Sequence, residues 1–137
     1  MLGYKHILLV TDLREDSDIV AARAKALLHT QDAHLSVLHI VEETVLAAGY
    51  ENELTSQAQT KIRELLQRHD LQATVHIDTA LSTRRGILDY AQNSKPDLII
   101  IGRHKRTGLA SLLGATADDI LPGVECDVLV VRLGEPV

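Results

Sequence analysis

The sequence predicts an α/β fold in which a parallel sheet carries helices on both faces. Two observations predict it: five short runs rich in aliphatic and β-branched residues, and segments of helical periodicity between those runs. Strands that alternate with helices pair in parallel, because each right-handed crossover returns the chain to the same end of the sheet. The 137 residues suffice for one domain, and we expect residues 1–137 to form a single unit.

The five apolar runs are the predicted strands. Continuous apolarity, as in the first, fourth and fifth runs, is typical of strands that are covered on both faces. The alternation of polar and apolar residues in the third run predicts an edge strand instead. The runs comprise residues 6–10, 35–41, 73–79, 98–101 and 128–131.

Four amphipathic helices are predicted between these strands. The first begins with an acidic segment, residues 15–18, where the positive end of the helix dipole favours negative charge. The second has a continuous apolar stripe and places Gln57, Lys61 and Arg68 on the opposite face. The apolar positions of the four helices are Val20, Ala24, Leu27 and Leu28; Leu54, Ala58, Ile62, Leu65 and Leu66; Ile87, Leu88 and Ala91; and Leu109, Leu112, Leu113, Ala117, Ile120 and Leu121.

Composition and charge argue against several classes of protein. A formal net charge of −5 opposes general nucleic-acid binding, because phosphate contacts need clustered Lys and Arg residues. The single cysteine, Cys126, forms no internal disulfide and suits a reducing compartment. No apolar stretch reaches the length of a membrane span. We therefore expect a cytoplasmic protein that binds neither nucleic acid nor a membrane.

The ends of the predicted strands are the places to search for a binding site. In open parallel sheets, ligands bind beyond the carboxyl ends of the strands, where the direction of winding reverses. The segment that follows the fourth strand is basic in an otherwise acidic chain, which indicates either an anion-binding loop or an ordinary solvated surface loop. The positions after the strand ends are Thr11 and Asp12, Val41 and Glu42, Ala80 and Leu81, and Gly102 onward.

Four segments taken together resemble the universal stress protein family, and the resemblance covers nearly the whole chain. The segments are residues 4–24, 35–43, 96–121 and 126–131. The resemblance implies a Rossmann-like, adenine-nucleotide-hydrolase-like α/β domain with five strands in the order 3-2-1-4-5. It also implies a cytoplasmic homodimer that regulates the stress response through protein partners and is not an enzyme.

Many members of that family bind ATP through a Gly-x2-Gly-x9-Gly-Ser/Thr loop, whose backbone N–H groups hold the phosphates. Laid on this sequence without gaps, the pattern falls on Gly102, Lys105, Ala115 and Thr116, and a shift of one residue brings in Gly114. Lysine at position 105 either blocks the loop or pairs with a phosphate through its ammonium group. Two functions therefore stay open: a regulator that acts through partners without ATP, and a stress sensor that binds ATP in the loop of residues 102–116.

Further candidate site residues follow from the same resemblance. Asp12 matches an aspartate that lies beside the adenosine in ATP-binding members, where its carboxylate would accept hydrogen bonds from the ribose hydroxyls. Asp12 could equally organise the turn in which it lies. Val41 matches a position whose backbone contacts adenine, and His104 could donate to a phosphate. The candidate nucleotide cleft consists of Asp12, Val41, Gly102, His104, Lys105, Gly114, Ala115 and Thr116.

The sequence presents no recognisable catalytic or metal-binding pattern. It has no Gly-x-Ser-x-Gly motif, no Walker loop and no paired carboxylates on a known framework. The seven histidines form no cluster with metal-ligand spacing. The turn after the first strand contains no glycine, unlike the glycine-rich turn of related families that cleave ATP. We expect no catalytic residues, no metal and no turnover.

The fifth run, which begins at Val128 and ends at Val131, is an edge strand in the order that the resemblance implies. An uncovered apolar edge is an aggregation hazard, because its backbone N–H and C=O groups are free to pair. Pairing with the same strand of a second copy around a two-fold axis would cover this edge. We therefore expect a homodimer through residues 128–131, which a charge at Val130 should weaken.

Overall fold

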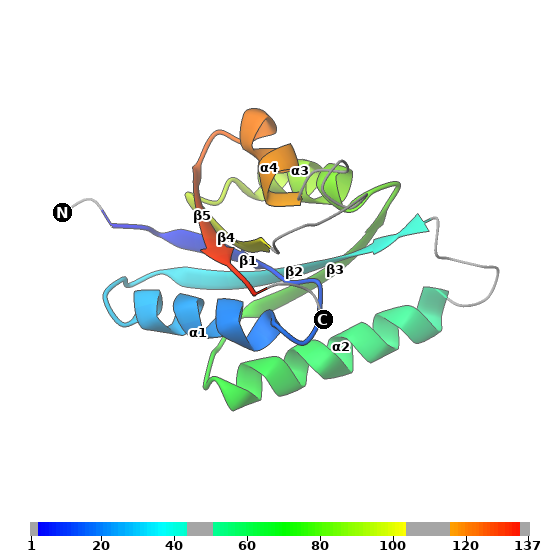
Figure 1. Cartoon of the computed structure of the whole chain (residues 1–137), viewed down its shortest axis with the longest axis horizontal. Coiled ribbons are helices and arrows are strands. Elements are labelled where there is room, and N and C mark those ends of the chain that lie inside the picture. Colours follow the sequence, from blue (N-terminus) through cyan, green and yellow to red (C-terminus); the bar gives the residue numbers. More distant parts are fainter. Residues whose placement is uncertain (1–2, 44–50, 104–115, 135–137) are drawn as a thin grey trace.

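A computed structural model of the chain contains a five-stranded parallel sheet in the order β3-β2-β1-β4-β5 (Figure 1). The structure describes residues 3–43, 51–103 and 116–134, with residues 51, 52 and 116 described by their backbone alone. The elements are β1 His6–Val10, α1 Ser17–Leu28, β2 His34–Glu42, α2 Glu51–Arg68, β3 Thr74–Ala80, α3 Thr83–Ser94, β4 Leu98–Arg103, α4 Thr116–Ile120, a 3-10 helix Leu121–Gly123 and β5 Asp127–Arg132.

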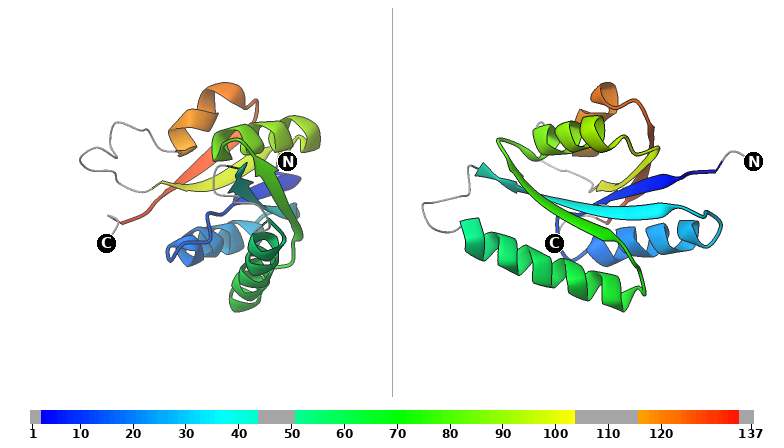
Figure 2. Two further views of the ribbon diagram at one scale, coloured as in Figure 1. Left: turned by 90° about the vertical axis from the view of Figure 1, so that its right-hand side faces the viewer. Right: turned by 180° about the vertical axis from the view of Figure 1, so that it is seen from behind.

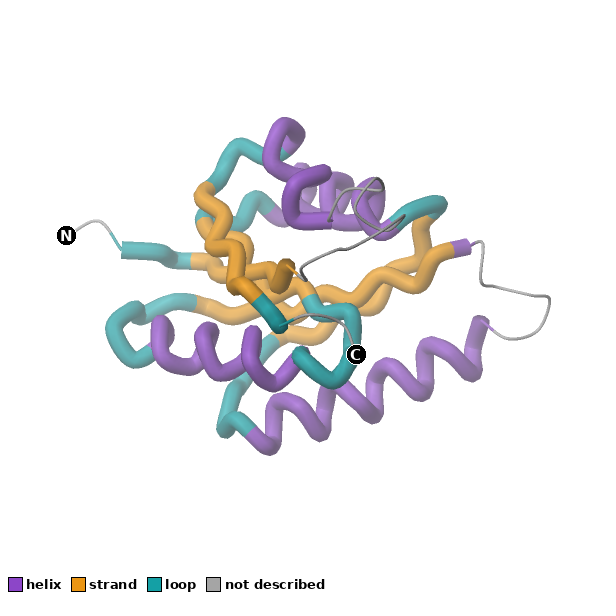
Figure 3. Tube along the Cα trace, in the orientation of Figure 1, coloured by secondary structure: helices purple, strands orange, loops and turns teal. Residues whose placement is uncertain are grey.

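The helices form one layer on each side of the sheet. Figures 1 and 2 show α1 and α2 on one face and α3 and α4 on the other, and Figure 3 shows the strands between the two helical layers. Alternation along β1 divides the core accordingly. Ile7 and Leu9 pack in a cluster with residues of α1 and α2, whereas Leu8 and Val10 pack with residues of α3 and α4. The predicted fold class, with its strand order, is confirmed.

The strands agree with the sequence prediction except in the environment of β5. Each predicted strand is present, and its ends differ by two residues or fewer. The apolarity of residues 128–131 predicted a strand covered on both faces, and this is confirmed only in part. Val131 packs in the cluster on the α1 and α2 side, and Val128 and Val130 pack against the cluster on the α3 and α4 side. Within the described residues, however, β5 pairs with β4 alone, and Leu129 is 36% exposed.

The fourth predicted helix is confirmed only in part. Within the described residues, α4 runs from Thr116 to Ile120, and Leu121 begins a 3-10 turn that contains Pro122. Leu109, Leu112 and Leu113 lie outside the described residues. None of the helices found in residues 3–43, 51–103 and 116–134 is both long and apolar enough to cross a lipid bilayer.

Candidate functional site

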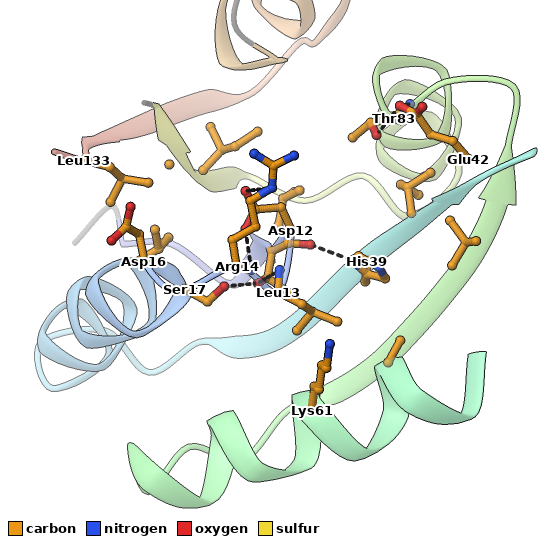
Figure 4. Close-up of a pocket in the computed structure, with 18 of the residues that line it drawn as sticks. Asp12, Leu13, Arg14, Asp16, Ser17, His39, Glu42, Lys61, Thr83 and Leu133 are labelled. Atoms are coloured by element: carbon orange, nitrogen blue, oxygen red, sulfur yellow. Dashed lines mark hydrogen bonds and ion pairs between the residues drawn. The ribbon is translucent and has the colours of Figure 1, made fainter. Parts of the chain in front are cut away.

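A cavity of about 670 Å³ lies beyond the carboxyl ends of β1, β2 and β4, and we call it the site cavity (Figure 4). Its walls are the turn between β1 and α1, the end of β2, one side of α2, the start of α3 and the end of β4. The chain winds away from β1 in opposite directions through β2 and β4, so the cavity occupies the switch point of the sheet. Its volume falls within the roughly 300–1,000 Å³ of small-molecule sites.

The structure brings together three of the predicted site residues. Asp12, Val41 and Gly102 all line the site cavity, although they belong to three different segments of the chain. The remaining predicted positions are not described: His104, Lys105, Gly114 and Ala115 lie outside the described residues, as does the side chain of Thr116. Ala80 and Leu81, which follow β3, do not line the cavity, and Leu81 is 72% exposed.

The turn between β1 and α1 is held by its own polar side chains. The hydroxyl of Thr11 accepts a hydrogen bond from the backbone N–H of Leu13 at 3.1 Å and donates one to the Ser17 hydroxyl at 3.1 Å. Oδ1 of Asp12 accepts from the N–H of Arg14 at 3.0 Å. Leu13 has a φ of +60°, which bends the backbone sharply between these bonds. Asp12 therefore does organise its turn, and its half-exposed carboxylate also borders the cavity.

The end of β2 contributes a histidine that the sequence analysis did not select. Nδ1 of His39 lies 2.8 Å from the carbonyl oxygen of Thr11. A carbonyl only accepts, so Nδ1 donates the proton in this hydrogen bond. His39 and Val41 are two residues apart on one strand and therefore share a face of the sheet. Its position on the same face as Val41 was the one feature of the sequence that could have identified His39 as a site residue.

Glu42, the last residue of β2, is bound to the first turn of α3. Its Oε1 accepts from the backbone N–H of Thr83 at 3.1 Å and from the Thr83 hydroxyl at 2.8 Å. A carboxylate is favoured there because the first N–H groups of a helix have no partner within it. Ser82 caps the same helix by accepting from the N–H of Arg85 at 3.1 Å. Glu42 and Thr83 thus fix one wall of the cavity.

Helix α2 forms the wall that the sequence analysis missed. Gln57 and Lys61 are exposed, as predicted for residues opposite the apolar stripe, and they also line the site cavity. The helix packs beside the sheet with its apolar stripe inward, and the polar residues flanking that stripe border the space beyond the strand ends. Figure 4 shows the Lys61 side chain pointing from α2 toward the turn that carries Leu13.

Arg68, the third of these polar residues, is also exposed, and it binds helix α1. Its Nε and Nη2 donate to the two carboxylate oxygens of Asp18 at 3.0 and 3.3 Å. Nε2 of His69 also lies 2.7 Å from Oδ1 of Asp18. Hydrogen bonds from Arg68, with a smaller contribution from His69, lower the pKa of Asp18 below its ordinary value. These contacts join α1 to the end of α2.

Gly102 has a packing reason to be glycine. A Cβ atom at this position would lie 2.7 Å from Cδ1 of Leu133 and 2.9 Å from Cγ2 of Val20. Both separations are shorter than nonbonded carbon atoms tolerate. Its predicted role is to offer bare backbone to a phosphate, but the space beside its Cα is filled by the protein's own side chains.

The described residues offer no clear metal centre. No group of three or more His, Cys, Asp or Glu residues within residues 3–43, 51–103 and 116–134 could hold a metal ion. The cavity instead combines carboxylates, cations and an apolar floor that includes Val10, Val41 and Ile101. This arrangement suits an organic ligand with both polar and apolar parts.

The family profile and the similar sequences both indicate the same family. The sequence profile of the universal stress protein family matches residues 3–132. Universal stress protein A homolog 2 of Coxiella burnetii is 34% identical over 143 residues, which cover 97% of this chain and 98% of that protein.

Two solved structures show the same fold. A universal stress protein in complex with cAMP gives a TM-score of 0.73 at 18% identity, covering 96% of this chain and 98% of the solved chain. A universal stress protein from Archaeoglobus fulgidus in complex with dAMP gives 0.67 at 14% identity, covering 94% of this chain and 98% of the solved one. At these identities the likeness establishes the fold.

Proposed function

The chain belongs to the universal stress protein family, and from this premise we propose that it binds an adenine nucleotide in the site cavity. One observation carries the proposal: Asp12, Val41 and Gly102, each selected from the sequence alone, border a single cavity of about 670 Å³. A cavity at the switch point of a parallel sheet is the usual place for a nucleotide. The complexes of two structural relatives with cAMP and dAMP support the choice of adenine nucleotides.

The nucleoside would lie beyond the carboxyl ends of β1 and β2. The Asp12 carboxylate accepts hydrogen bonds from the ribose hydroxyls, while the backbone at Val41 contacts the base. Val10 and Val41 both line the site cavity and so offer apolar contacts to the base. The hydrogen bonds around Thr11 hold the turn in place before a ligand arrives, which reduces the ordering cost of binding.

The proposed activity is binding without turnover. The turn after β1 contains no glycine, and its Thr11 and Asp12 side chains are engaged in holding the backbone. Residues so engaged are suited to shape a site rather than to activate a nucleophile. Nucleotide occupancy would then alter the surface that the protein offers to its partners, and the protein would act as a nucleotide-responsive regulator.

The regulator is proposed to be a homodimer that pairs through β5. This strand is at the sheet edge with Leu129 36% exposed, and an uncovered edge favours pairing with another strand. A two-fold axis would bring two copies of β5 together. Val130 packs against the core cluster on the α3 and α4 side, so a charge there would disturb folding as well as pairing. Leu129 is therefore the better position for a test.

Calorimetric titration of nucleotide-free protein with ATP, AMP and adenosine tests the proposed binding. Asp12→Asn keeps an oxygen that can accept from the Arg14 N–H but removes the charge that binds the ribose. We expect about a tenfold loss of affinity for all three ligands, because hydrogen bonds to a charged group are the stronger ones. Asp32→Asn, which removes an exposed carboxylate from the segment before β2, is the control.

Two results would contradict the proposed function. The first is the absence of binding by the native protein at millimolar nucleotide. The second is unchanged affinity in Asp12→Asn. Chromatography of the same samples after incubation checks the absence of turnover, since ATP should be recovered intact.

A further inference from the structure

Thr11 is held by β2 on both sides of its Cα atom. Its backbone N–H donates to the carbonyl oxygen of Leu38 at 3.0 Å, and its own carbonyl oxygen accepts from Nδ1 of His39 at 2.8 Å. Thr11 is buried, at 6% exposure, so water competes little for these groups. The two bonds therefore fix the peptide units before and after Thr11.

The bond from His39 extends the contact between β1 and β2 beyond their last paired residues. The two strands are paired in register as far as Val10 and Leu38. One residue later, the imidazole of His39 binds the carbonyl of Thr11. The chain then leaves the sheet, and Leu13 has a φ of +60°. His39 thus holds the chain at the point where the turn begins.

Asp12 follows Thr11 directly, so the bond from His39 acts on the peptide unit that carries Asp12. A peptide unit is planar, and a fixed carbonyl group therefore fixes the direction of the next Cα atom as well. The Asp12 carboxylate is oriented further by the N–H of Arg14, which donates to Oδ1 at 3.0 Å. His39 and Asp12 both line the site cavity, and Figure 4 shows the His39 ring beside the turn that carries Asp12. One planar unit thus links the imidazole to the residue that bears the carboxylate.

We propose that His39 positions Asp12 for the ribose hydroxyls of the nucleotide and thereby sets the preference of the site for ribose over sugars without these hydroxyls. This inference rests on the proposed function and adds a positioning residue to the same site. Without the bond from His39, the peptide unit after Thr11 could rotate and displace the carboxylate. A hydrogen bond weakens steeply when its donor and acceptor are misaligned, so a small displacement is sufficient to lose the ribose contacts.

Paired titrations with ATP and 2′,3′-dideoxy-ATP measure this preference, because the two ligands differ only in the sugar hydroxyls. The native protein should bind ATP at least about tenfold more tightly, since hydrogen bonds to a carboxylate are the stronger ones. His39→Leu removes the donor and should lower the affinity for ATP by about tenfold. Its affinity for dideoxy-ATP should stay within about twofold of the native value, which a general collapse of the cavity would not allow.

Two further variants separate the hydrogen bond from the bulk of the ring. His39→Asn keeps an N–H donor near the place of Nδ1 and should retain most of the preference for ATP. In His39→Ser the side chain is too short to reach the carbonyl of Thr11, so this variant should lose the preference as His39→Leu does. It provides the test if His39→Leu prevents folding, which melting temperatures reveal.

His34→Leu is the matched control. His34 is an exposed histidine at the start of the same strand, and it does not line the site cavity. Its replacement should leave both affinities unchanged. An effect equal to that of His39→Leu would overturn the proposal, because it would then follow from the loss of either histidine of β2.

The outcomes separate this inference from the proposed function. If the native protein binds neither ligand at millimolar concentration, both are wrong. If it binds the two ligands equally, the ribose contact is absent and the inference is wrong, while nucleotide binding stands. If it prefers ATP, and His39→Leu and His39→Ser keep that preference or lose affinity for both ligands equally, only the role of His39 is wrong.

Discussion

Oε1 of Glu42 accepts two hydrogen bonds from one residue, Thr83: one from the backbone N–H at 3.1 Å and one from the hydroxyl at 2.8 Å. The two residues are 41 positions apart in the sequence and join the end of β2 to the start of α3. Both are half-buried, so neither donor of Thr83 is fully open to water. This junction fixes part of the wall of the site cavity.

Removal of the Glu42 side chain should destabilise the protein. We expect Glu42→Ala to lower the free energy of unfolding by about 1–3 kcal/mol, because two partly buried donors lose their acceptor. Urea denaturation measures the change. Glu43→Ala, which truncates the exposed neighbouring glutamate, is the control. An equal effect of the two substitutions would mean that the Thr83 contact contributes nothing.

A methyl group at Gly102 should be costly even without a ligand. Gly102→Ala places Cβ 2.7 Å from Leu133 and 2.9 Å from Val20, and such overpacking costs about 1–3 kcal/mol. Gly134→Ala is the control, since nothing lies within 4 Å of a Cβ at that position. Thermal unfolding of the two variants measures the difference in their stability. Shortening the neighbour, in the double variant Gly102→Ala with Leu133→Ala, should relieve part of the strain. A neutral Gly102→Ala would show that packing does not require glycine.

The ion pairs of Asp18 should make stability fall in acid. Arg68 and His69 lower the Asp18 pKa from its ordinary value of 3.8, so the unfolded chain binds a proton more readily than the folded one. The stabilisation is fully present above the unfolded pKa and is lost as the pH falls from there through the folded pKa. Asp18→Asn should therefore flatten the decline below about pH 4, seen in urea midpoints.

Glu64→Gln is the control for that acid decline. Glu64 is exposed on α2 and has no ion pair within the described ranges 3–43, 51–103 and 116–134. Its substitution should leave the shape of the pH profile as in the native protein. A profile of Asp18→Asn that follows the native one at every pH would rule out a stabilising role for these ion pairs.

The two edges of the sheet should respond differently to a charge. Leu129 on β5 is 36% exposed and Val75 on β3 is 39% exposed, so a lysine is tolerated by the monomer at either place. If two copies pair through β5, Leu129→Lys should be monomeric in sedimentation equilibrium, and Val75→Lys should stay dimeric. Dimers that persist in Leu129→Lys but dissociate in Val75→Lys would place the interface at β3.

Local pattern was sufficient to predict the elements of the fold. Runs of β-branched residues and stripes of helical period mark β1 to β4 and α1 to α3, because these patterns report which side chains must be buried. The apolar run at residues 128–131 did not reveal that β5 lies at an edge of the sheet, because composition does not distinguish a strand between two neighbours from one at an edge. The strand order came from the family resemblance and not from periodicity.

The site was predictable only where it follows strand ends. Asp12, Val41 and Gly102 were found because the carboxyl ends of parallel strands converge on one edge of the sheet. Lys61 was missed because helical periodicity places it on a polar face, and only the tertiary arrangement sets that face beside the cavity. Thr83 was missed for a similar reason: its partner, Glu42, comes from a segment 41 residues earlier.

Amide NMR spectra recorded during a titration with ATP test most directly whether the nucleotide occupies the site cavity. We predict saturable shifts of the backbone signals of Asp12, Val41 and Gly102, which border the cavity. The signals of His6, at the start of β1, and Asp97, just before β4, lie at the opposite edge and should stay in place. Spectra without shifts at the three cavity residues, or with the largest shifts at the opposite edge, would contradict the account.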